Sequence, residues 1–432
     1  MSTSLPWIWQ KEHWPAITYD AQALGADLGD AYRMHGVIEG KAVAIGLTST
    51  SDVAVEAMAV EVMSTAAIEG ETLSMDAVRS SVRRRLGLAA TGPADRNVDG
   101  LVAVLQDAAG AFDQPLDDDR LCRWQSALFP SGTSGLNRIA VGRYREHVDA
   151  MQIVSGPIDR ETVHYEAPSS SEVPRHMQDF LRWFDATTPG REPVQKVQPI
   201  DGIARAAVAH LWFESIHPFE DGNGRIGRAI VDMAVAQHMR QPVRLYSLSR
   251  QLQSVREDYY NSLNVAQRGG LDATAWVQWF VRQCTAAYTA ANHVIDQALE
   301  KRRFWERQEG SVLNERQLKV LQRLLDSGDG GFVGGLNAQK YIHLTGASKA
   351  TATRDLADLV NQGRLWTQGA GKALRYFVNV PGWTHGIDHT LPADSVAEPS
   401  PLPGGELRAP AKRPAAGADH VAKLRIRPKS KL

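Results

Sequence analysis

The sequence predicts a mainly α-helical protein with several domains. Its 432 residues exceed the length of one ordinary domain, and 43% hydrophobic with 22% charged residues are proportions typical of a soluble globular chain. Apolar residues recur at three- and four-residue steps through most of the chain, which is the periodicity of helices. The alternation and turn residues of a β-hairpin appear in two places. We therefore expect helical bundles with little sheet.

Net charge and cysteine content argue against several classes of protein. The formal net charge of -1 and the isoelectric point near 6.9 give no overall basic field, so binding to nucleic acid would need a local patch. Cys122 and Cys284 are too few for a disulfide framework or a thiolate metal site. The N-terminus lacks the order of a secretory signal, and no apolar run reaches the roughly 18 residues of a membrane span. We expect a cytoplasmic protein without membrane contacts.

Residues 1–95 are expected to form an N-terminal helical accessory region. The first 20 residues are rich in aromatic side chains, a composition typical of an arm that packs on a neighbouring surface. Apolar residues at helical spacing predict an amphipathic helix from Asp52 to Ile68, and Gly70 is placed to end it. Glu69, beside this helix end, would on sequence alone be interpreted as a solvated carboxylate.

Residues 96–300 are expected to form the central domain. A loop rich in Gly, Pro, Asp and Asn precedes helical periodicity from Asp99 to Phe129. Further along, β-branched and aromatic residues flank a Ser-Gly-Pro turn and predict a β-hairpin, which includes Val163. Apolar spacing then predicts another helix, which must end at His217 because a proline follows.

The stretch from His217 to Arg228 concentrates groups that suit phosphate chemistry. Helical periodicity resumes at Ile226, so residues 222–224 form a turn that opens directly into a second helix. Backbone N–H groups at such a helix start are unpaired and aimed at an anion, and the glycines let the backbone curl around it. Arg225 and Arg228 lie three residues apart and can reach phosphates from one helix face. The stretch therefore predicts a phosphate-binding site.

Two further side chains of this stretch add chemistry to the predicted phosphate site. Asp221 supplies a carboxylate suited to Mg2+, which usually keeps one or two protein carboxylates together with substrate phosphates. His217 is the group in the stretch whose ordinary pKa suits proton transfer near neutral pH.

The stretch from His217 to Arg228 resembles the active-site motif of the Fic family, H-P-F-x-(D/E)-G-N-G-R-x-x-R, and matches it at every specified position. The resemblance implies a Fic-type helical bundle with a small β-hairpin flap. It also implies an adenylyltransferase that moves AMP from ATP to a Tyr, Thr or Ser hydroxyl of a target protein, or of itself. In such an enzyme His217 would take the hydroxyl proton and Asp221 would bind Mg2+ or Mn2+. The residues implied in phosphate binding are Gly222, Asn223, Gly224, Arg225 and Arg228.

Two other segments extend the resemblance. Residues 65–70, Thr-Ala-Ala-Ile-Glu-Gly, resemble the family's inhibitory pattern (S/T)-x-x-x-E-(G/N). This implies that Glu69 pairs in bidentate fashion with Arg228, which should otherwise hold the γ-phosphate, and that Thr65 fixes the carboxylate. The hairpin around Val163 resembles the flap that covers a Fic active site and holds the target strand by edge pairing.

Some residues near the motif remain open between a structural and a functional role. The sequence predicts a helix that contains Tyr259, Tyr260 and Asn264 and ends at Gly269. Aromatic residues at this spacing usually pack in a core, and the alternative is an adenine pocket. For His164, in the hairpin, a structural role is favoured over a catalytic one.

Residues 301–383 are expected to form a separate domain. Within residues 313–382, the pattern of three helices followed by a hairpin resembles a winged helix-turn-helix. The resemblance implies that the third helix enters the major groove of DNA, although such modules also bind proteins. The side chains that would face DNA are Ser348, Lys349, Thr351, Arg354 and, on the wing, Lys372.

Residues 384–432 are expected to be a disordered basic tail, because Pro, Ala, Gly and Ser replace apolar residues and Lys and Arg accumulate towards the end. The final Ser-Lys-Leu matches a peroxisomal address, which we interpret as a coincidence within a basic tail.

Several alternatives remain open at the level of the sequence. The same site could remove AMP from a target, with Glu69 orienting a water molecule, or use UTP or CDP-choline in place of ATP. A different class is a DNA-binding regulator whose Fic domain senses ATP and whose residues 313–382 contact DNA. A homodimer is also compatible with the sequence.

Overall fold

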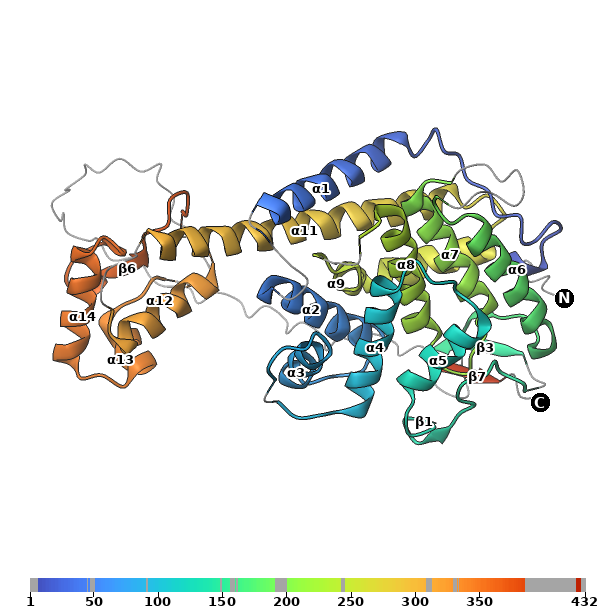
Figure 1. Ribbon diagram of the computed structural model, residues 1–432, viewed down its shortest axis with the longest axis horizontal. Helices are drawn as coiled ribbons and strands as arrows, with labels where there is room; N and C mark the ends of the chain where they lie inside the picture. The colour runs from blue at the N-terminus through green and yellow to red at the C-terminus, as the bar shows by residue number, and fades with distance from the viewer. Residues whose placement is uncertain are drawn as a thin grey trace, which may run out of the picture. The chain divides into compact units, whose positions relative to one another are not determined.

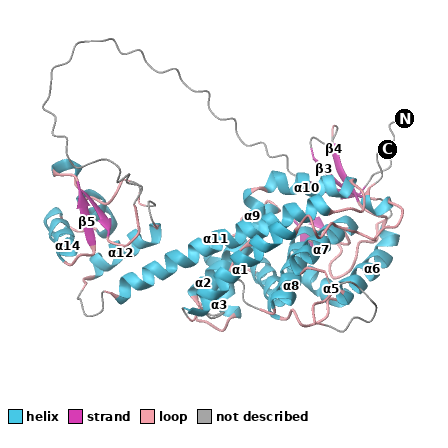
Figure 2. Cartoon of the chain, turned by 90° about the horizontal axis from the view of Figure 1, so that it is seen from above, coloured by secondary structure: helices cyan, strands magenta, loops and turns pink. Residues whose placement is uncertain are grey.

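The computed structural model of the chain (Figure 1) describes residues 7–44, 46, 51–90, 92–147, 150–155, 160, 162–190, 200–241, 245–307, 313–328, 332, 334–384 and 425–428. The chain divides into two compact units, residues 1–295 with 420–432 (unit 1) and residues 296–419 (unit 2). Helices dominate the described residues (Figure 2), which confirms the mainly helical fold class predicted from the sequence. None of the helices in the described ranges is both long and apolar enough to cross a bilayer.

Unit 1 begins with a short 3-10 helix and three α-helices. These are η1 (Ile8–Gln10), α1 (Gly25–Ala44), α2 (Asp52–Ile68) and α3 (Met75–Arg85). α2 begins where the side chain of Ser51 accepts a hydrogen bond from the N–H of Ala54. It ends before Gly70, whose φ of +80° is a backbone conformation that favours glycine. The helix predicted from Asp52 to Ile68 is confirmed with its bounds.

The centre of unit 1 is a bundle of helices. They are α4 (Arg96–Gly110), α5 (Asp118–Leu128), α6 (Val173–Ala186), α7 (Gly202–Ile216), α8 (Asn223–Met239), α9 (Leu248–Ser254), α10 (Arg256–Arg268) and α11 (Thr274–Glu306), whose last residues belong to unit 2. Every residue of α7 is buried, because other elements cover the helix on all sides. α7 packs against α8 in the middle of the unit (Figure 1).

The helical run predicted from Asp99 to Phe129 is divided in the structure. α4 ends at Gly110, and α5 starts anew where the carboxylate of Asp117 accepts a hydrogen bond from the N–H of Arg120. The buried guanidinium of Arg120 then ties the connection together, donating to the carboxylate of Asp107 at 2.8 Å.

A three-stranded sheet lies beside the helical bundle. The predicted hairpin is confirmed as β3 (Met151–Ser155) paired antiparallel with β4 (Thr162–Glu166), and residues 156–159 of its turn lie outside the described residues. β7 (Arg425–Pro428) pairs antiparallel with the other edge of β3, giving the order β4-β3-β7. The sequence predicted disorder for residues 384–432, whereas these four residues form a strand. The prediction failed here because an exposed sheet edge offers backbone hydrogen-bond partners that amino-acid composition does not reveal. A small pair, β1 (Thr133–Ser134) and β2 (Asn137–Arg138), completes the sheets described in unit 1.

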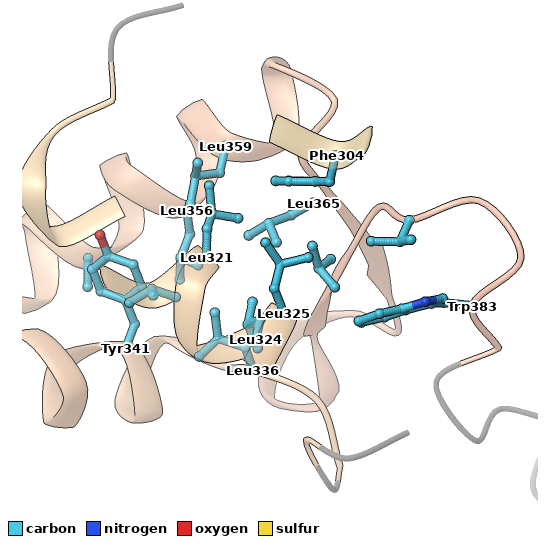
Figure 3. Packing of buried hydrophobic residues seen from close by; sticks show 14 residues of the cluster. Phe304, Leu321, Leu324, Leu325, Leu336, Tyr341, Leu356, Leu359, Leu365 and Trp383 are labelled. Atoms are coloured by element: carbon cyan, nitrogen blue, oxygen red, sulfur yellow. The ribbon is translucent and has the colours of Figure 1, made fainter. Parts of the chain in front are cut away.

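Unit 2 is three helices followed by a two-stranded hairpin, in the order that the sequence predicts. The elements are α12 (Glu315–Ser327), α13 (Ala338–Thr345), α14 (Lys349–Asn361), β5 (Leu365–Gln368), η3 (Gly371–Ala373) and β6 (Arg375–Val378). Leucines of α12 and α14 meet Leu336 and Leu365 in its core (Figure 3). In the same unit, the buried carboxylate of Asp355 accepts hydrogen bonds from Tyr341 and Arg316. The winged-helix interpretation stays a prediction.

Candidate active site

The turn between α7 and α8 places His217 in a strained backbone conformation. His217 caps the C-terminus of α7 with φ 51° and ψ 61°, the left-handed region that residues other than glycine adopt at a cost of about 1–3 kcal/mol. The buried Arg145 holds this conformation: its Nε donates to the carbonyl of His217 at 2.8 Å and its Nη2 donates to the carbonyl of Pro168 at 2.7 Å. The backbone N–H of Arg145 also donates to the carbonyl of Pro218 at 2.9 Å. The sequence places Arg145 in the segment that resembles the flap, but its contact with His217 was not predicted, because no pattern links it to residues more than 70 positions later.

The imidazole of His217 is buried and neutral. Burial lowers the pKa of His217 to about 3, and the charge of Arg145 adds to the effect. Among the described residues neither ring nitrogen has a hydrogen-bond partner. A neutral imidazole with an unoccupied nitrogen can accept a proton from an incoming group.

Glu214 lies one helical turn before His217 and faces the same ring. Its Oε2 is 3.7 Å from His217 Nδ1. Burial raises the pKa of Glu214 to about 8, and the nearby negative charge of Glu69 adds to this. The carboxyl group therefore holds its proton near neutral pH. The sequence contained a signal for Glu214, its i, i+3 spacing from His217, that sequence analysis did not use.

The loop between the two helices is shaped by Asn223. The side-chain oxygen of Asn223 accepts from the N–H of Phe219 at 2.9 Å, and its side-chain nitrogen donates to the carbonyl of Phe219 at 2.8 Å. Both ends of this amide are thus occupied by the loop, which leaves backbone N–H groups at the start of α8 to face an anion. Gly222, with φ +92°, is the position where the turn requires glycine.

Arg228 is held by the C-terminal end of α2. Its Nη2 donates to Glu69 Oε1 at 2.8 Å and to the carbonyl of Thr65 at 3.0 Å, and its Nε donates to Thr65 Oγ1 at 2.7 Å. The sequence resemblance implied a bidentate pair in which Thr65 fixes Glu69. The structure corrects both details, because the Thr65 hydroxyl and carbonyl bind Arg228 directly and Glu69 accepts a single hydrogen bond from Nη2, the nitrogen that also donates to the Thr65 carbonyl.

The charge state of Glu69 follows from its neighbours. Burial opposes ionisation of the carboxyl group, but the positive charges of Arg228 and Arg225 outweigh it and hold the pKa of Glu69 below its usual value. A Cβ atom at Gly224 would come within 2.3 Å of Glu69 Oε1, so glycine also leaves room for this carboxylate. Glu69 therefore sits as an anion directly over the start of α8.

A second carboxylate, that of Glu71, forms an ion pair with Arg225 that was not predicted from the sequence. Glu71 Oε1 accepts from Arg225 Nη1 at 2.9 Å, and Asp221 Oδ1 lies 3.7 Å from Arg225 Nη2. The guanidinium also lies over the ring of Phe129, 4.9 Å from its centroid. The missed signal is a pair of acidic residues on either side of the glycine that ends α2.

Asp221 is the metal ligand predicted from the sequence. Its carboxylate accepts hydrogen bonds from the hydroxyl of Ser134 and the N–H of Gly222. Across the described ranges, no three His, Cys, Asp or Glu side chains gather as a ready-made metal site. Since Mg2+ commonly takes one or two protein carboxylates and completes its shell with phosphates and water, the donor set is that of an ion shared with a nucleotide.

The residues considered for an adenine pocket separate into two groups. Tyr259 is fully buried, its hydroxyl lies 2.7 Å from His210 Nε2, and its ring stacks on Trp279, so it packs in the core. Tyr260 instead lies under Arg256, and both contact the carbonyl of Ile68 at the end of α2. Asn264 follows one turn later on α10 and is half-buried. Tyr260 and Asn264 remain predictions for base binding.

The hairpin is fixed to the turn that carries His217. The hydroxyl of Tyr165, in β4, donates to the carbonyl of Ser215 at the end of α7. The N-terminal arm covers the other side: Trp7 packs edge-on against Tyr165, and the indole N–H of Trp9 donates to the carbonyl of Glu166 at 2.8 Å. The expectation that the aromatic arm packs on a neighbouring surface is confirmed.

Comparisons with known proteins place this site within one family of domains. Residues 115–235 match the family model described as Fic/DOC family, and residues 7–88 match one described as Domain of unknown function (DUF4172). "Protein adenylyltransferase fic-1" of Caenorhabditis elegans is 27% identical over 210 residues, which is 48% of this chain and 36% of that protein. "Protein adenylyltransferase Fic" of Drosophila erecta is 29% identical over 146 residues, 33% of this chain and 26% of that protein. The match thus spans about a third of the length of these relatives or less.

Two solved structures resemble this chain in part. A Fic family protein from Desulfovibrio desulfuricans superposes with a TM-score of 0.44 at 18% identity, covering 84% of this chain and 98% of that one. Fic-1 from C. elegans gives a TM-score of 0.41 at 22% identity, covering 65% and 74%.

Proposed function

Because the chain is a Fic-domain protein whose relatives are named protein adenylyltransferases, we propose that it transfers AMP from ATP to a Tyr, Thr or Ser hydroxyl of a target protein. The observation that supports this most strongly is the neutral imidazole of His217 beside two arginines and the start of α8, which no side chain of its N-cap residue caps. This arrangement offers a proton acceptor next to a site for several phosphates.

The proposed reaction uses the groups of this turn in a defined order. The target hydroxyl attacks the α-phosphorus while His217 accepts its proton, a new oxygen–phosphorus bond forms, and the bond to the β-phosphate oxygen breaks. Pyrophosphate leaves with the electron pair. The N–H groups at the start of α8, at residues 223–225, stabilise the charge that develops on the phosphate oxygens.

Asp221 would hold the Mg2+ or Mn2+ that accompanies the nucleotide. Such an ion neutralises phosphate charge when bound. In its absence Asp221 remains engaged with Ser134 and the N–H of Gly222, so the carboxylate is already fixed in position. Arg225 and Arg228 would orient the β- and γ-phosphates.

Both arginines are occupied by the segment that follows α2, which supports an inhibited resting state. Glu69 pairs with Arg228 and Glu71 pairs with Arg225, so phosphates must replace two carboxylates before both guanidinium groups can bind them. We propose that Glu69 is the main restraint, because the side chains of the Glu69–Arg228 pair are less exposed than those of the Glu71–Arg225 pair.

A test of the transfer reaction uses the Glu69→Gly protein, Mg2+ and ATP labelled at the α-phosphate. The expected result is label on the enzyme itself or on a lysate protein that is unlabelled without the enzyme; the purified enzyme should gain no label from γ-labelled ATP, because the γ-phosphate leaves in pyrophosphate. Replacing His217 by Ala in the same background should abolish the label. A folded Glu69→Gly protein that transfers nothing from α-labelled ATP would overturn the proposal; label from UTP or CDP-choline alone would redirect it to another nucleotide.

Unit 2 favours a second function, binding to DNA. Ser348 caps α14, and its neighbour Lys349 and the later Arg354 are exposed, while Ala352 and Leu356 face the core. A helix that follows a short turn and exposes two basic side chains suits the major groove. A mobility-shift assay of the full chain over a range of salt tests this, with Lys349→Glu/Arg354→Glu as the variant. Retention of the shift by that variant would exclude α14 as the reading helix.

A further inference from the structure

The C-terminal segment of the chain adds a third strand to the β3–β4 hairpin, which resembles the flap of a Fic domain. β3 pairs with β4 on one side and with Arg425–Pro428 (β7) on the other, in the register Met151 with Pro428 and Val154 with Arg425. Without β7, the outer edge of β3 would present unpaired N–H and C=O groups, which readily accept another extended segment. The chain therefore fills, with its own residues, an edge that could bind a different peptide.

The base of the β3–β4 hairpin lies beside the proposed catalytic turn. Arg145, six residues before β3, donates to the carbonyl of His217, and it also donates to the carbonyl of Pro168, two residues after β4. Tyr165, in β4, donates to the carbonyl of Ser215. The hairpin is thus anchored at its base to the end of α7, so a segment paired with β3 joins a sheet that is fixed to the residues around His217.

The pairing of β7 is consistent with its sequence. The carbonyl of Met151 accepts from the N–H of Ala167 at 2.9 Å, so the hydrogen-bonding groups of Met151 face β4 rather than β7. Pro428, which lies opposite Met151, therefore loses no hydrogen bond through its missing N–H. The paired residues are Arg, Ile, Arg and Pro, none of which carries a hydroxyl that could accept AMP.

We infer that the outer edge of β3 is a docking surface for an extended peptide segment and that Arg425–Pro428 occupies it as an internal competitor of the target. The catalytic consequence rests on the proposed AMP transfer. Main-chain hydrogen bonds supply the affinity for any extended segment, and the alternating side chains supply its selectivity. Because β7 offers no hydroxyl, it blocks the edge without being consumed.

A binding experiment tests the docking surface without catalysis. The full chain is compared with a variant that ends at Lys423, using a fluorescent peptide of residues 421–432 and its anisotropy. The truncated protein should bind the peptide roughly tenfold more tightly, because the tethered segment competes at an effective concentration in the millimolar range. Equal affinities for the two proteins, with both folded by circular dichroism, would overturn the inference.

Two altered peptides decide whether the contact is strand pairing. Neighbouring residues of a strand direct their N–H groups to opposite edges, so an Ile426→Pro/Arg427→Pro peptide must lose one bond to β3 and should not bind. The matched control, Ile426→Val/Arg427→Lys, should bind like the parent peptide. Binding of the double-proline peptide with parental affinity would mean that charge alone holds the tail, and would contradict the assigned pairing.

A kinetic experiment tests the consequence in the Glu69→Gly background. Truncation at Lys423 should lower the KM for the protein target severalfold and leave the KM for ATP unchanged, because only the docking edge is freed. An unchanged target KM would contradict the competitor role. If no AMP transfer occurs at all, the proposed function fails while the peptide measurements still decide whether β7 docks on β3.

Discussion

Arg225 Nη1 donates a hydrogen bond to Glu71 Oε1 at 2.9 Å, only two residues beyond the carboxylate that pairs with Arg228. The two arginines are three residues apart on α8, and the two carboxylates flank Gly70 at the end of α2. The turn at Gly70 thus presents one anion to each guanidinium.

Replacing Glu69 by Gly should raise AMP transfer by about 10- to 100-fold. A charge-assisted hydrogen bond to a buried guanidinium contributes about 1.5–3 kcal/mol, and its loss lets Arg228 bind a phosphate. The measurement is the initial rate with α-labelled ATP, together with the affinity for ATP by calorimetry. Glu56→Gln is the matched control, since Glu56 lies on the same helix and pairs with Arg79 at the surface. Equal rates for the wild type and the Glu69→Gly protein would exclude the restraint.

Replacing Glu71 by Gln should have a smaller effect in the same direction. The Glu71 side chain is 43% exposed, so its pair with Arg225 contributes about 0.2–1 kcal/mol, or up to roughly fivefold in rate. The effect should shrink at high salt, because exposed ion pairs are screened. The double variant should exceed Glu69→Gly alone. A Glu71→Gln protein less active than the wild type would mean that Glu71 supports Arg225 rather than restrains it.

The sequence was sufficient for the elements whose signals are local. The bounds of α2 follow from apolar spacing between Ser51 and Gly70, and the turn before α8 follows from the proline after His217 and the glycines at 222 and 224. In each case the residues that decide the structure are neighbours in the chain, so a single sequence reveals them.

Contacts between distant segments could not be predicted in the same way. Arg145 binds the carbonyl of His217, and β7 pairs with β3, but neither contact leaves a local pattern, because backbone carbonyls and sheet edges accept any suitable donor. Glu71 was missed for a different reason. An acidic residue after a helix end is usually solvated, and only the placement of α2 over α8 brings it to Arg225.

The stability of the protein should depend on Glu214 between pH 4.5 and 8. The folded state keeps the proton of Glu214 up to a pKa of about 8, whereas the unfolded state releases it near 4.5, so this residue makes stability fall as the pH rises through that window. In Glu214→Gln this contribution is absent. As the pH rises between these limits, the free energy of unfolding of the variant should therefore increase relative to that of the wild type by about 1.4 kcal/mol per pH unit.

Urea denaturation at pH 5 and pH 8 measures this difference. Glu257→Gln, on the exposed side of α10, serves as the control and should leave the pH dependence unchanged. A Glu214→Gln curve parallel to the wild type would show that the carboxyl group titrates normally. Burial of His217 has the opposite effect on the pH dependence of stability. Its pKa is about 3 in the folded state and about 6.5 in the unfolded state, so this residue makes stability rise with pH between these two values.

Replacing Arg145 by Lys should impair both stability and turnover. Arg145 Nε and Nη2 donate to the carbonyls of His217, Pro168 and Ile216, and burial lowers its pKa to about 10. A lysine ammonium cannot reach all three carbonyls in the planar arrangement of a guanidinium, and each buried acceptor left unsatisfied costs about 1–3 kcal/mol. The left-handed conformation of His217 would then relax, which should lower kcat more than it raises the KM for ATP.

The matched control for that substitution is Arg143→Lys. Arg143 lies two residues earlier, is exposed and pairs only weakly with Glu146, at 3.5 Å, so the same change of side chain should leave both stability and kcat within experimental error. Thermal unfolding and steady-state kinetics in the Glu69→Gly background measure the two effects together. If Arg145→Lys unfolds at a lower temperature yet keeps its kcat, Arg145 stabilises the fold without positioning His217. A fall in kcat at a temperature where the variant is fully folded is the result expected if the buried guanidinium holds the proposed base in place.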